Sequence, residues 1–431
     1  MKVSIHWFRR DLRLDDNHGL YKALESDHPT IPLFIFDSDI LEELPEDDAR
    51  VTFIHQQLSD MHAQLLEKGS GMVIQHGKPL EIWKKLIKGY DIAEVHTNGD
   101  YEPYALQRDE SIQKLLAQHD IPFHMHKDQV IFEKDEVVKD DGDPYTVYTP
   151  YSKKWLSQLE ESMLEPHWSS KNMHRYHEFK KRPDLPSLAD IGFKESAIKV
   201  PAYDIDEELI STYDKTRNLP AMSGTSKIGA HLRFGTISVR KAFKRTYEVN
   251  MTYAKELIWR EFFMQILYHF PHVVEHNFRR KYDAVKWRNN EEEFEKWCKG
   301  ETGYPFVDAG MRELNETGFM HNRVRMITAG FLTKHLLIDW RWGEAYFAEK
   351  LLDYDLSSNN GNWQWAAGTG CDAAPYFRVF NPTTQIDKFD KDRKYIRQWV
   401  PEFESDDYPE PMVEHKMARE RALDTYKTAL N

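Results

Sequence analysis

Cysteine is scarce in this chain, which has only Cys298 and Cys371 among 431 residues. Two cysteines exclude both a disulfide framework and a zinc site built from cysteines, and they are typical of a reducing compartment. No apolar run approaches the roughly 20 residues that a membrane-spanning helix needs. Arg9 and Arg10 come too early for a signal peptide. We therefore expect a cytoplasmic protein with no membrane partner.

Positive charge is also in deficit. The 71 acidic residues outnumber the 58 basic ones, and the formal net charge is −13. This balance excludes indiscriminate binding of nucleic acid, although a local basic face can still hold DNA. Aromatic residues, by contrast, are plentiful at 13%, with 12 tryptophans, which suits either flat ligands or a large core.

Two common motifs are missing. The residues after the first expected strand, Arg9–Asn17, contain no Gly-x-Gly-x-x-Gly, so a dinucleotide fingerprint is absent. No His-Glu-x-x-His occurs either, and Pro271 interrupts the one helical spacing of histidines. We therefore expect no metal site. The histidines considered are His269, His272 and His276, and separately His124 with His126.

The first part of the chain alternates short apolar runs with longer amphipathic ones. This alternation predicts an α/β domain with a parallel five-stranded, doubly wound sheet. The expected strands are Val3–Phe8, Ile31–Phe36, Met72–Gln75, Ala93–Thr97 and Pro122–His126. The expected helices are Asn17–Glu25, Asp47–Glu67, Pro79–Lys88 and Ala105–Gln118.

The pattern changes twice further along. Turn-rich sequence around Asp140–Pro144 and Lys181–Pro186 predicts a long connection, and strand signals then vanish. Periodic segments at Thr252–Tyr268, Phe319–Leu337 and Val413–Ala429 predict helices. We expect an α/β domain over residues 1–127, a linker over 128–196 and a large all-α domain over 197–431.

The stretch from Asn359 to Pro382 crowds Trp, Tyr and Phe among Asn, Gly and Asp, and composition alone favours a buried aromatic turn. Its sequence, NNGNWQWAAGTGCDAAPYFRVFNP, closely resembles the flavin-binding core of class I DNA photolyases, which use light to split cyclobutane pyrimidine dimers. The domain layout also resembles the photolyase/cryptochrome family, with an α/β antenna domain, a linker and a helical FAD domain. The resemblance implies bound FAD, reduced in the active state.

Gly224–Gly229 reads Gly-Thr-Ser-Lys-Ile-Gly at an expected helix start, which suits either a bound phosphate or a simple helix cap. The resemblance makes it the site of the FAD pyrophosphate, with Tyr213 as a further flavin contact. Gly229 departs from the family, which usually has a serine there. The residues implied are Tyr213, Thr225, Ser226, Lys227, Ile228 and Gly229.

Glu256 and Trp259 share a helix face with Phe263, which can form a pocket for the edge and the plane of a base. The residues alone favour a plain helix with a Glu256–Arg260 pair. The resemblance instead implies a dimer pocket and assigns catalytic roles to Glu256, Trp259, Asn322, Met326 and Trp365. Photolyases for the (6-4) product carry histidines where this chain has Asn322 and Met326, so the cyclobutane dimer is favoured.

Further flavin contacts follow from the resemblance alone. Arg325 and Asp353 resemble a buried ion pair beside the flavin ring, and Asp355 a second carboxylate near it. Asn359 stands where the family places the residue that faces flavin N5, and asparagine is the photolyase residue there. Arg260 is also expected to contact the cofactor.

Three tryptophans lie in contexts similar to the family's. On composition alone Trp287, Trp340 and Trp363 are core residues. The resemblance makes them a chain that passes electrons to FAD in light, with Trp363 nearest the flavin and Trp287 at the surface.

The expected partner is UV-damaged DNA, held at its phosphates by Arg217, Arg323 and Arg378. Excited reduced FAD would pass an electron to a flipped-out dimer, and the electron would return after the ring opens. A cryptochrome-like photoreceptor and a (6-4) photolyase are the alternatives. A monomer is expected. Ala105 replaces a glutamate of folate-binding members, so an antenna of deazaflavin or flavin is favoured over folate.

Overall fold

The computed structural model describes residues 1–430, and within them the chain forms two compact units. The first unit joins residues 1–136, 155–203 and 227–248. The second unit joins residues 137–154, 204–226 and 249 onward. Each unit is therefore discontinuous along the chain, whereas the domain boundaries expected after residues 127 and 196 describe continuous ranges.

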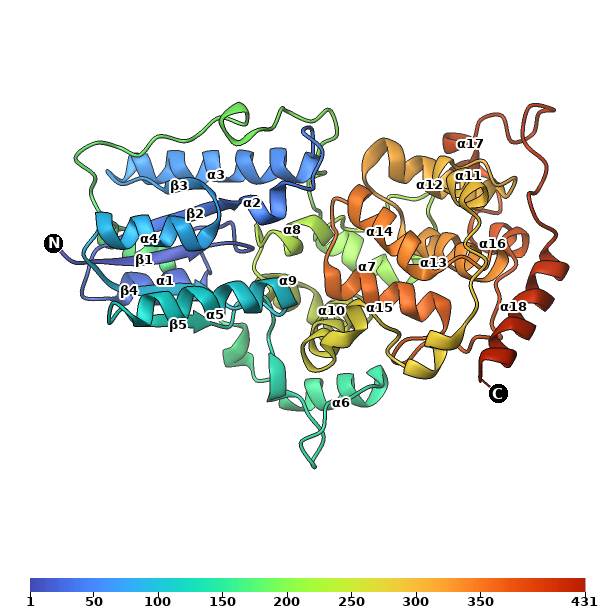
Figure 1. Ribbon diagram of the computed structural model, residues 1–431, viewed down its shortest axis with the longest axis horizontal. Coiled ribbons are helices and arrows are strands. Elements are labelled where there is room, and N and C mark those ends of the chain that lie inside the picture. The colour runs from blue at the N-terminus through green and yellow to red at the C-terminus, as the bar shows by residue number, and fades with distance from the viewer. Residues whose placement is uncertain (431) are drawn as a thin grey trace. The chain divides into compact units, whose positions relative to one another are not determined.

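The first unit contains a parallel five-stranded sheet with the strand order β3-β2-β1-β4-β5. Its strands can be followed in Figure 1 from blue to teal. They are β1 (Val3–Phe8), β2 (Thr30–Asp37), β3 (Val73–Gly77), β4 (Ile92–Asn98) and β5 (Phe123–His126). The predicted α/β class and all five strands are confirmed, each boundary within one residue or two.

Helices cover both faces of this sheet, as a doubly wound topology requires. Phe8, Phe34 and Ile74 pack with side chains of α1 (His18–Glu25) and α3 (Ala49–Glu67). The alternate positions Trp7, Leu33 and Val73 pack with α4 (Pro79–Gly89) and α5 (Pro103–Ala117). Successive strand residues point to opposite faces, so the continuous apolar runs supply both cores.

Buried ion pairs explain why residues 227–248 belong to the first unit. Arg240 lies 2.8 Å from carboxylate oxygens of both Asp16 and Asp128, and Arg13 lies 2.5 Å from Asp128. Burial would raise the pKa of Asp128, but the two guanidinium groups hold that pKa well below its usual range. The pairing anchors α9 (Val239–Tyr247) to the loop that follows β1.

The remaining elements of the first unit are short. They are α2 (Ser38–Leu41), α8 (Gly229–Arg233), α9 (Val239–Tyr247), η1 (Lys134–Glu136), η2 (Glu161–Leu164), η3 (Ser169–Arg175) and η4 (Ala189–Ile191). Helix α6 (Tyr148–Gln158) begins in the second unit and ends in the first.

The second unit is helical, as predicted. The expected segments appear as α10 (Met251–His269), as α13 (Asn322–Gly330) continued by a π-helical turn η7 (Phe331–His335), and as α18 (His415–Leu430). The other helices are α7 (Glu207–Thr216), η5 (Pro271–Val274), η6 (Arg280–Ala284), α11 (Glu291–Lys299), α12 (Pro305–Thr317), α14 (Trp340–Lys350), α15 (Leu356–Ala367), α16 (Pro382–Phe389) and α17 (Lys394–Trp399).

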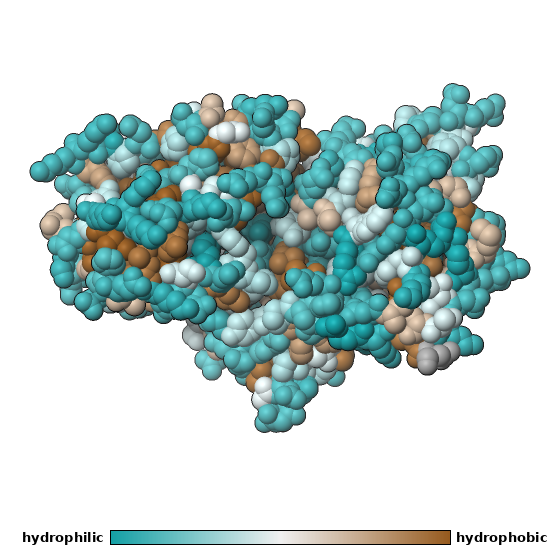
Figure 2. All heavy atoms as spheres, in the orientation of Figure 1, coloured by the Kyte–Doolittle hydropathy of each residue, from teal (hydrophilic) through white to brown (hydrophobic). Residues whose placement is uncertain are grey.

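The largest core of the second unit gathers side chains from α11 to α15, including Trp297, Phe306, Leu332 and Trp363. The face drawn in Figure 2 is mostly hydrophilic, in keeping with a charged content of 30%. Among residues 1–430, no helix has the length and apolar character needed to cross a membrane.

Candidate active site

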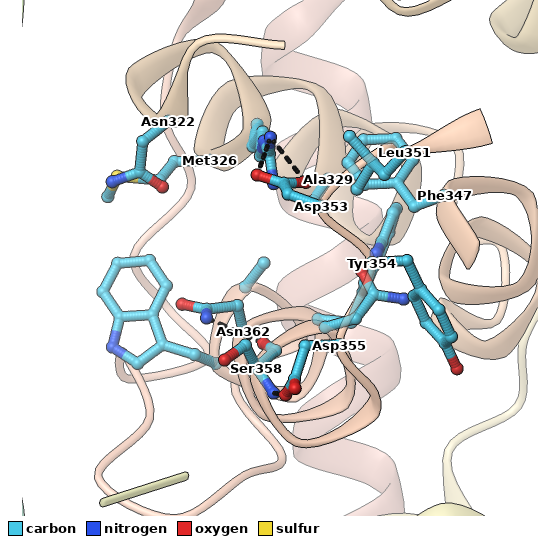
Figure 3. Close-up of a pocket in the computed structure, with 15 residues that line it drawn as sticks. Asn322, Met326, Ala329, Phe347, Leu351, Asp353, Tyr354, Asp355, Ser358 and Asn362 are labelled. Carbon is cyan, nitrogen blue, oxygen red and sulfur yellow. Dashed lines mark hydrogen bonds and ion pairs between the residues drawn. The ribbon is translucent and has the colours of Figure 1, made fainter. Parts of the chain in front are cut away.

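A pocket of about 590 Å³ lies in the second unit, between α13 on one side and α14 and α15 on the other. We call it the first pocket. Figure 3 shows Asn322 and Met326 on one wall, and Asp355, Ser358 and Asn362 opposite them. Its lining includes the expected Asn322, Arg325, Met326, Asp353, Asp355, Asn359, Trp363 and Trp365.

The predicted pair of Arg325 and Asp353 is present at the edge of this pocket. Arg325 Nη2 lies 2.9 Å from Asp353 Oδ2, and Arg325 Nε donates to the Met320 carbonyl over 2.7 Å. Burial of this pair beside a flavin ring stays a prediction. The two side chains are 25% and 22% exposed because they face the open pocket. A bound ring would therefore meet a fixed cation and a fixed carboxylate.

Asn359 is oriented by a residue that sequence reasoning missed. Its Nδ2 donates to the Glu344 carbonyl over 3.0 Å and to Glu344 Oε1 over 2.8 Å. With the amide nitrogen engaged, the Asn359 oxygen is left to accept a hydrogen bond in the pocket. Burial raises the pKa of Glu344, while the bond from Asn359 opposes that rise. No motif signals Glu344, because its role depends only on the packing of α14 against α15.

Asp355 sets the start of α15. Its side chain accepts a hydrogen bond from the Ser358 backbone N–H over 3.2 Å and another from the Ser357 hydroxyl. An aspartate at the N-cap position commonly accepts such a hydrogen bond from the first turn of a helix. The cap fixes the first turn of α15, from which Ser358 and Asn359 reach the pocket.

A second pocket of about 940 Å³ adjoins the first. Both are lined by Asn322, Met326, Ser358, Asn362 and Trp365, so these residues form a shared wall. The rest of the second pocket is lined by Arg217, Glu256, Trp259, Arg260 and Phe263. The structure thus brings the expected dimer-binding residues together. Arg260, expected to contact the cofactor, lines this second pocket.

Glu256 forms an ion pair with Arg217, which follows α7. A residue outside its own helix therefore helps to hold the Glu256 carboxylate. Burial raises the pKa of Glu256, and the Arg217 guanidinium opposes that rise. Arg217, expected at DNA phosphates, is therefore committed to Glu256 here. Contact with a phosphate would require its guanidinium to change partners.

Trp259 is held flat by Tyr148, a second residue that sequence reasoning missed. Their rings stack with centroids 3.6 Å apart and planes 7° apart, and Tyr148 donates to the Lys255 carbonyl over 2.9 Å. Phe263 lies on the same helix with its ring centroid 5.6 Å from Trp259. The stack fixes the plane of the indole that lines the second pocket.

The expected phosphate-binding segment changes unit between Ser226 and Lys227. In the second unit, Ser226 accepts a 2.6 Å hydrogen bond from Tyr253, and Tyr253 meets Tyr213 edge to face at 4.8 Å. Thr225 is the residue directly before Ser226 in the sequence. Ile228 and Gly229 stand in the first unit, where Gly229 begins α8 as the helix-start expectation requires.

The three tryptophans expected to transfer electrons lie in different surroundings. Trp363 lines the first pocket and packs on Gly343, where an added Cβ would lie 2.1 Å from its Cη2. Trp340 stands one turn earlier on α14, and its Nε1 donates to Asn277 over 2.9 Å.

Two hydrogen bonds connect the residues around Trp287 to the segment before Trp340. Arg288 N donates to the Leu337 carbonyl over 2.7 Å, and Asp339 N donates to Asn289 Oδ1 over 2.9 Å. Residues 287–289 therefore lie against the segment that leads into Trp340. Trp363 and Trp340 are buried, whereas Trp287 is half-buried. The order expected from the resemblance, from Trp363 at the flavin to Trp287 at the surface, stays a prediction.

Comparisons with known proteins identify the family of this chain. Residues 4–168 match the family described as DNA photolyase, and residues 253–406 match the FAD binding domain of DNA photolyase. A protein of Salmonella typhimurium named deoxyribodipyrimidine photo-lyase is 36% identical over 476 residues, covering 100% of this chain and 99% of that one. The chain belongs to the DNA photolyase family. The predicted resemblance is thereby confirmed.

Solved photolyases share the fold. A bacterial class III photolyase from Agrobacterium tumefaciens has a TM-score of 0.88 at 33% identity and covers 100% of this chain and 98% of its own. An archaeal photolyase from Sulfolobus tokodaii with two FAD molecules has a TM-score of 0.84 at 34% identity, covering 99% of each chain. The predicted photolyase fold is confirmed.

The first pocket suits FAD, the cofactor of this family's helical domain. The edge of a flavin ring carries both hydrogen-bond donors and acceptors, and the pocket offers the Arg325 guanidinium, the Asp353 carboxylate and the Asn359 amide. The indole of Trp363 supplies an apolar aromatic surface beside them. The donor set of the pocket therefore matches the cofactor.

The remaining basic residues differ in their surroundings. Arg323 donates to Asn218 Oδ1 over 2.6 Å, and its guanidinium lies 4.3 Å from the ring centroid of Phe389. Arg378 is exposed beside Phe377, whose side chain is 60% exposed. Arg378 can therefore reach a ligand as it stands, whereas Arg323 would have to part from Asn218 and from the buried ring of Phe389.

Proposed function

We propose that the chain repairs cyclobutane pyrimidine dimers in DNA in a light-dependent reaction. The observation that carries this proposal is the wall shared by the two pockets, formed by Asn322, Met326, Ser358, Asn362 and Trp365. The second pocket would hold a ligand against that wall, and the residues of the first pocket would hold FAD next to the same wall. Bound reduced FAD supplies an electron on excitation and takes it back after the dimer has split.

The second pocket has the surfaces that a flipped dimer needs. Trp259 and Trp365 offer flat aromatic faces, and Met326 offers an adaptable apolar contact. Asn322 can both donate to and accept from a base edge. A damaged pair stacks poorly, so extruding it from the duplex costs at most a few kcal/mol.

Glu256 is the proposed hydrogen-bond donor to the thymine carbonyls. Burial raises the pKa of its carboxyl, which favours the acid form that can donate. A donor held in place before reaction stabilises negative charge that develops on those oxygens. Release of Arg217 to a DNA phosphate would remove the one charge that opposes protonation of Glu256.

DNA would be held at its phosphates by Arg217, Arg323 and Arg378. Because phosphate contacts release counterions, affinity should fall as salt rises. With a net charge of −13 the rest of the surface opposes DNA, so binding depends on this local group. We propose that the protein acts as a monomer in the cytoplasm.

Asn322 and Met326 support the cyclobutane dimer over the (6-4) product, because neither can act as the acid that a histidine provides. The class I assignment rests on the same residues together with Asn359.

The archaeal relative solved with two FAD molecules supports a second flavin as the antenna pigment. Ala105, buried at the start of α5, leaves no carboxylate there for a folate.

The test is repair of a thymine dimer in a synthetic oligonucleotide by the purified, FAD-loaded, reduced chain. We expect dimer loss under near-UV or blue light and none in the dark. Loss of a (6-4) product instead would reassign the substrate. Bound FAD with no repair of either lesion would favour a cryptochrome-like photoreceptor.

A further inference from the structure

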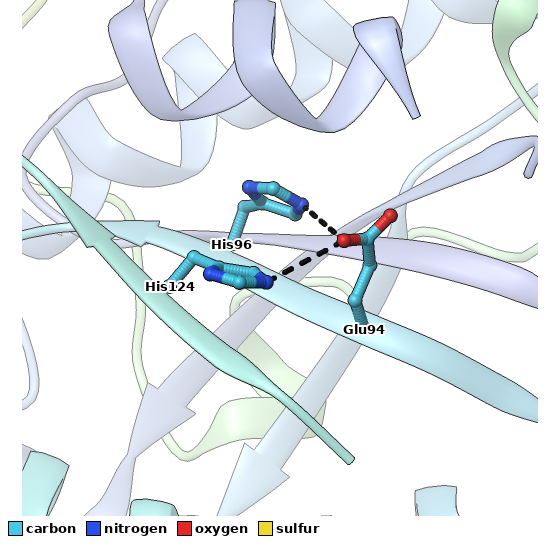
Figure 4. A group of neighbouring side chains, drawn as sticks. All are labelled: Glu94, His96 and His124. Atoms are coloured by element: carbon cyan, nitrogen blue, oxygen red, sulfur yellow. Dashed lines mark ion pairs between the residues drawn. The ribbon is translucent and has the colours of Figure 1, made fainter. Parts of the chain in front are cut away.

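The sheet of the first unit gathers two histidines and a glutamate at its β5 edge. In the parallel pairing of β4 with β5, His96 is the direct partner of His124. Glu94 stands two residues before His96, so it points to the same face of the sheet. Figure 4 shows the rings of His96 and His124 and the carboxylate of Glu94 directed toward one another.

The spacing of the ligand atoms suits a small metal ion. His96 Nε2 lies 3.3 Å from Glu94 Oε2, and His124 Nε2 lies 3.5 Å from the same oxygen. One ligand atom from each residue lies within 4.8 Å of the other two. Zinc bonds of about 2.0–2.2 Å in a tetrahedron separate neighbouring ligand atoms by about 3.4 Å. Small movements of the rings therefore suffice to complete the geometry.

His96 provides an independent sign of a ligand. Its side chain is 92% buried, and among the described residues its Nε2 has no hydrogen-bond partner of good geometry, although Glu94 is near. Leaving such an atom unpaired is unfavourable, and native proteins rarely do so. A metal ion bound to Nε2 would satisfy it.

Neighbouring groups hold the ligands in place. His96 Nδ1 lies 3.0 Å from His126 Nε2, which fixes the ring orientation and leaves Nε2 for a metal. The Ser26 hydroxyl donates to Glu94 Oε1, the carboxylate oxygen that faces away from the histidines. Metal-binding histidines and carboxylates commonly have such outer partners.

We propose that Glu94, His96 and His124 form a binding site for a divalent transition-metal ion, with Zn²⁺ as the best match. Two histidines and a glutamate are a known zinc ligand set that leaves a fourth position for water. His124 is 45% exposed, so solvent reaches that position. The site lies in the first unit and shares no residue with either pocket of the second unit.

This site revises our expectation that the chain has no metal site. The sequence pattern paired His124 with His126, which stand on one strand and share a face. Strand pairing instead places His124 beside His96, 28 positions earlier in the sequence. Such a ligand set has no local spacing, so only the sheet register brings it together.

Equilibrium dialysis of the untagged, FAD-loaded full chain against Zn²⁺, with metal counted by mass spectrometry, tests the proposal. The variants are His124→Ala and Glu94→Gln, and His119→Ala removes another exposed histidine as a control. We expect one zinc per chain in the wild type and the control, and a Kd raised by more than about tenfold in both variants. X-ray absorption at the zinc edge should show two imidazoles and oxygen ligands.

His124 and Glu94 lie partly at the surface, so their variants should keep the fold, which far-UV circular dichroism and FAD content would verify. Two results would overturn the proposal. One is the absence of stoichiometric zinc in the wild type. The other is stoichiometric zinc that binds equally well to folded His124→Ala and Glu94→Gln, because the ion would then lie elsewhere.

Discussion

Replacing Gly343 by alanine should disturb the tryptophan that lines the FAD pocket. An added Cβ would lie 2.1 Å from Trp363 Cη2, 2.5 Å from Cζ3 and 2.6 Å from Leu332 Cδ2. Ordinary carbon contacts are about 3.5–4.0 Å long, so the indole must move by more than about 1 Å. Trp363 is only 2% exposed and has little room to do so.

The size of the effect on stability follows from two opposing terms. Overpacking a filled core costs about 1–3 kcal/mol. Replacing glycine by alanine inside a helix returns about 1 kcal/mol. Gly330→Ala on α13 is the matched control, because its Cβ would meet only Phe380 Cδ2, at 3.8 Å. The two variants should therefore differ by about 1–3 kcal/mol in free energy of unfolding.

Two assays read out this change. Urea unfolding compares the two variants directly, and light-driven reduction of bound FAD by an external donor reports on the route through Trp363. We expect Gly343→Ala to lose stability and to photoreduce its FAD more slowly than Gly330→Ala. If Gly343→Ala were as stable as the control and photoreduced FAD at the same rate, electron transfer to FAD would not depend on the packing of Trp363 against α14.

Three further results are expected. Trp340→Phe should abolish photoreduction of FAD but keep repair by chemically reduced enzyme, whereas unchanged photoreduction would remove Trp340 from the route. Asp353→Asn leaves the Arg325 guanidinium without its charged partner, so the FAD Kd measured by flavin fluorescence should rise roughly 10- to 150-fold, or about 1.5–3 kcal/mol; an unchanged Kd would place the ring elsewhere. Because burial raises the pKa of Glu256 and the acid form is the donor, repair yield should fall as pH rises through that raised pKa. Glu256→Gln should keep FAD and flatten this pH dependence, and an unaltered profile would exclude Glu256 as the titrating donor.

Local sequence predicted the sheet domain well, because its signals are local. Each strand is a short apolar run, and the helices between them start at residues such as Asn17, which caps α1, and Pro79, which begins α4. The resemblance to photolyases supplied many residues of both pockets, but not Ser358 and Asn362 of the shared wall. In the structure, most of the expected residues line one of the two pockets.

Partners chosen by tertiary packing could not be predicted. Tyr148 lies 111 positions before the Trp259 that it stacks on, and Arg217 lies 39 positions before Glu256. Neither forms a motif with its partner, and each depends on a separate segment that folds against α10. Glu344 was missed for the same reason.

Light-driven repair is measured by comparing light and dark reactions of one reduced, FAD-loaded preparation on DNA that carries a single cyclobutane thymine dimer. We expect Trp365→Ala, which alters the wall shared by the two pockets, to keep FAD but to repair far fewer dimers per absorbed photon than the wild type. Equal repair by the variant, or equal repair by the wild type in the dark, would contradict the proposed function.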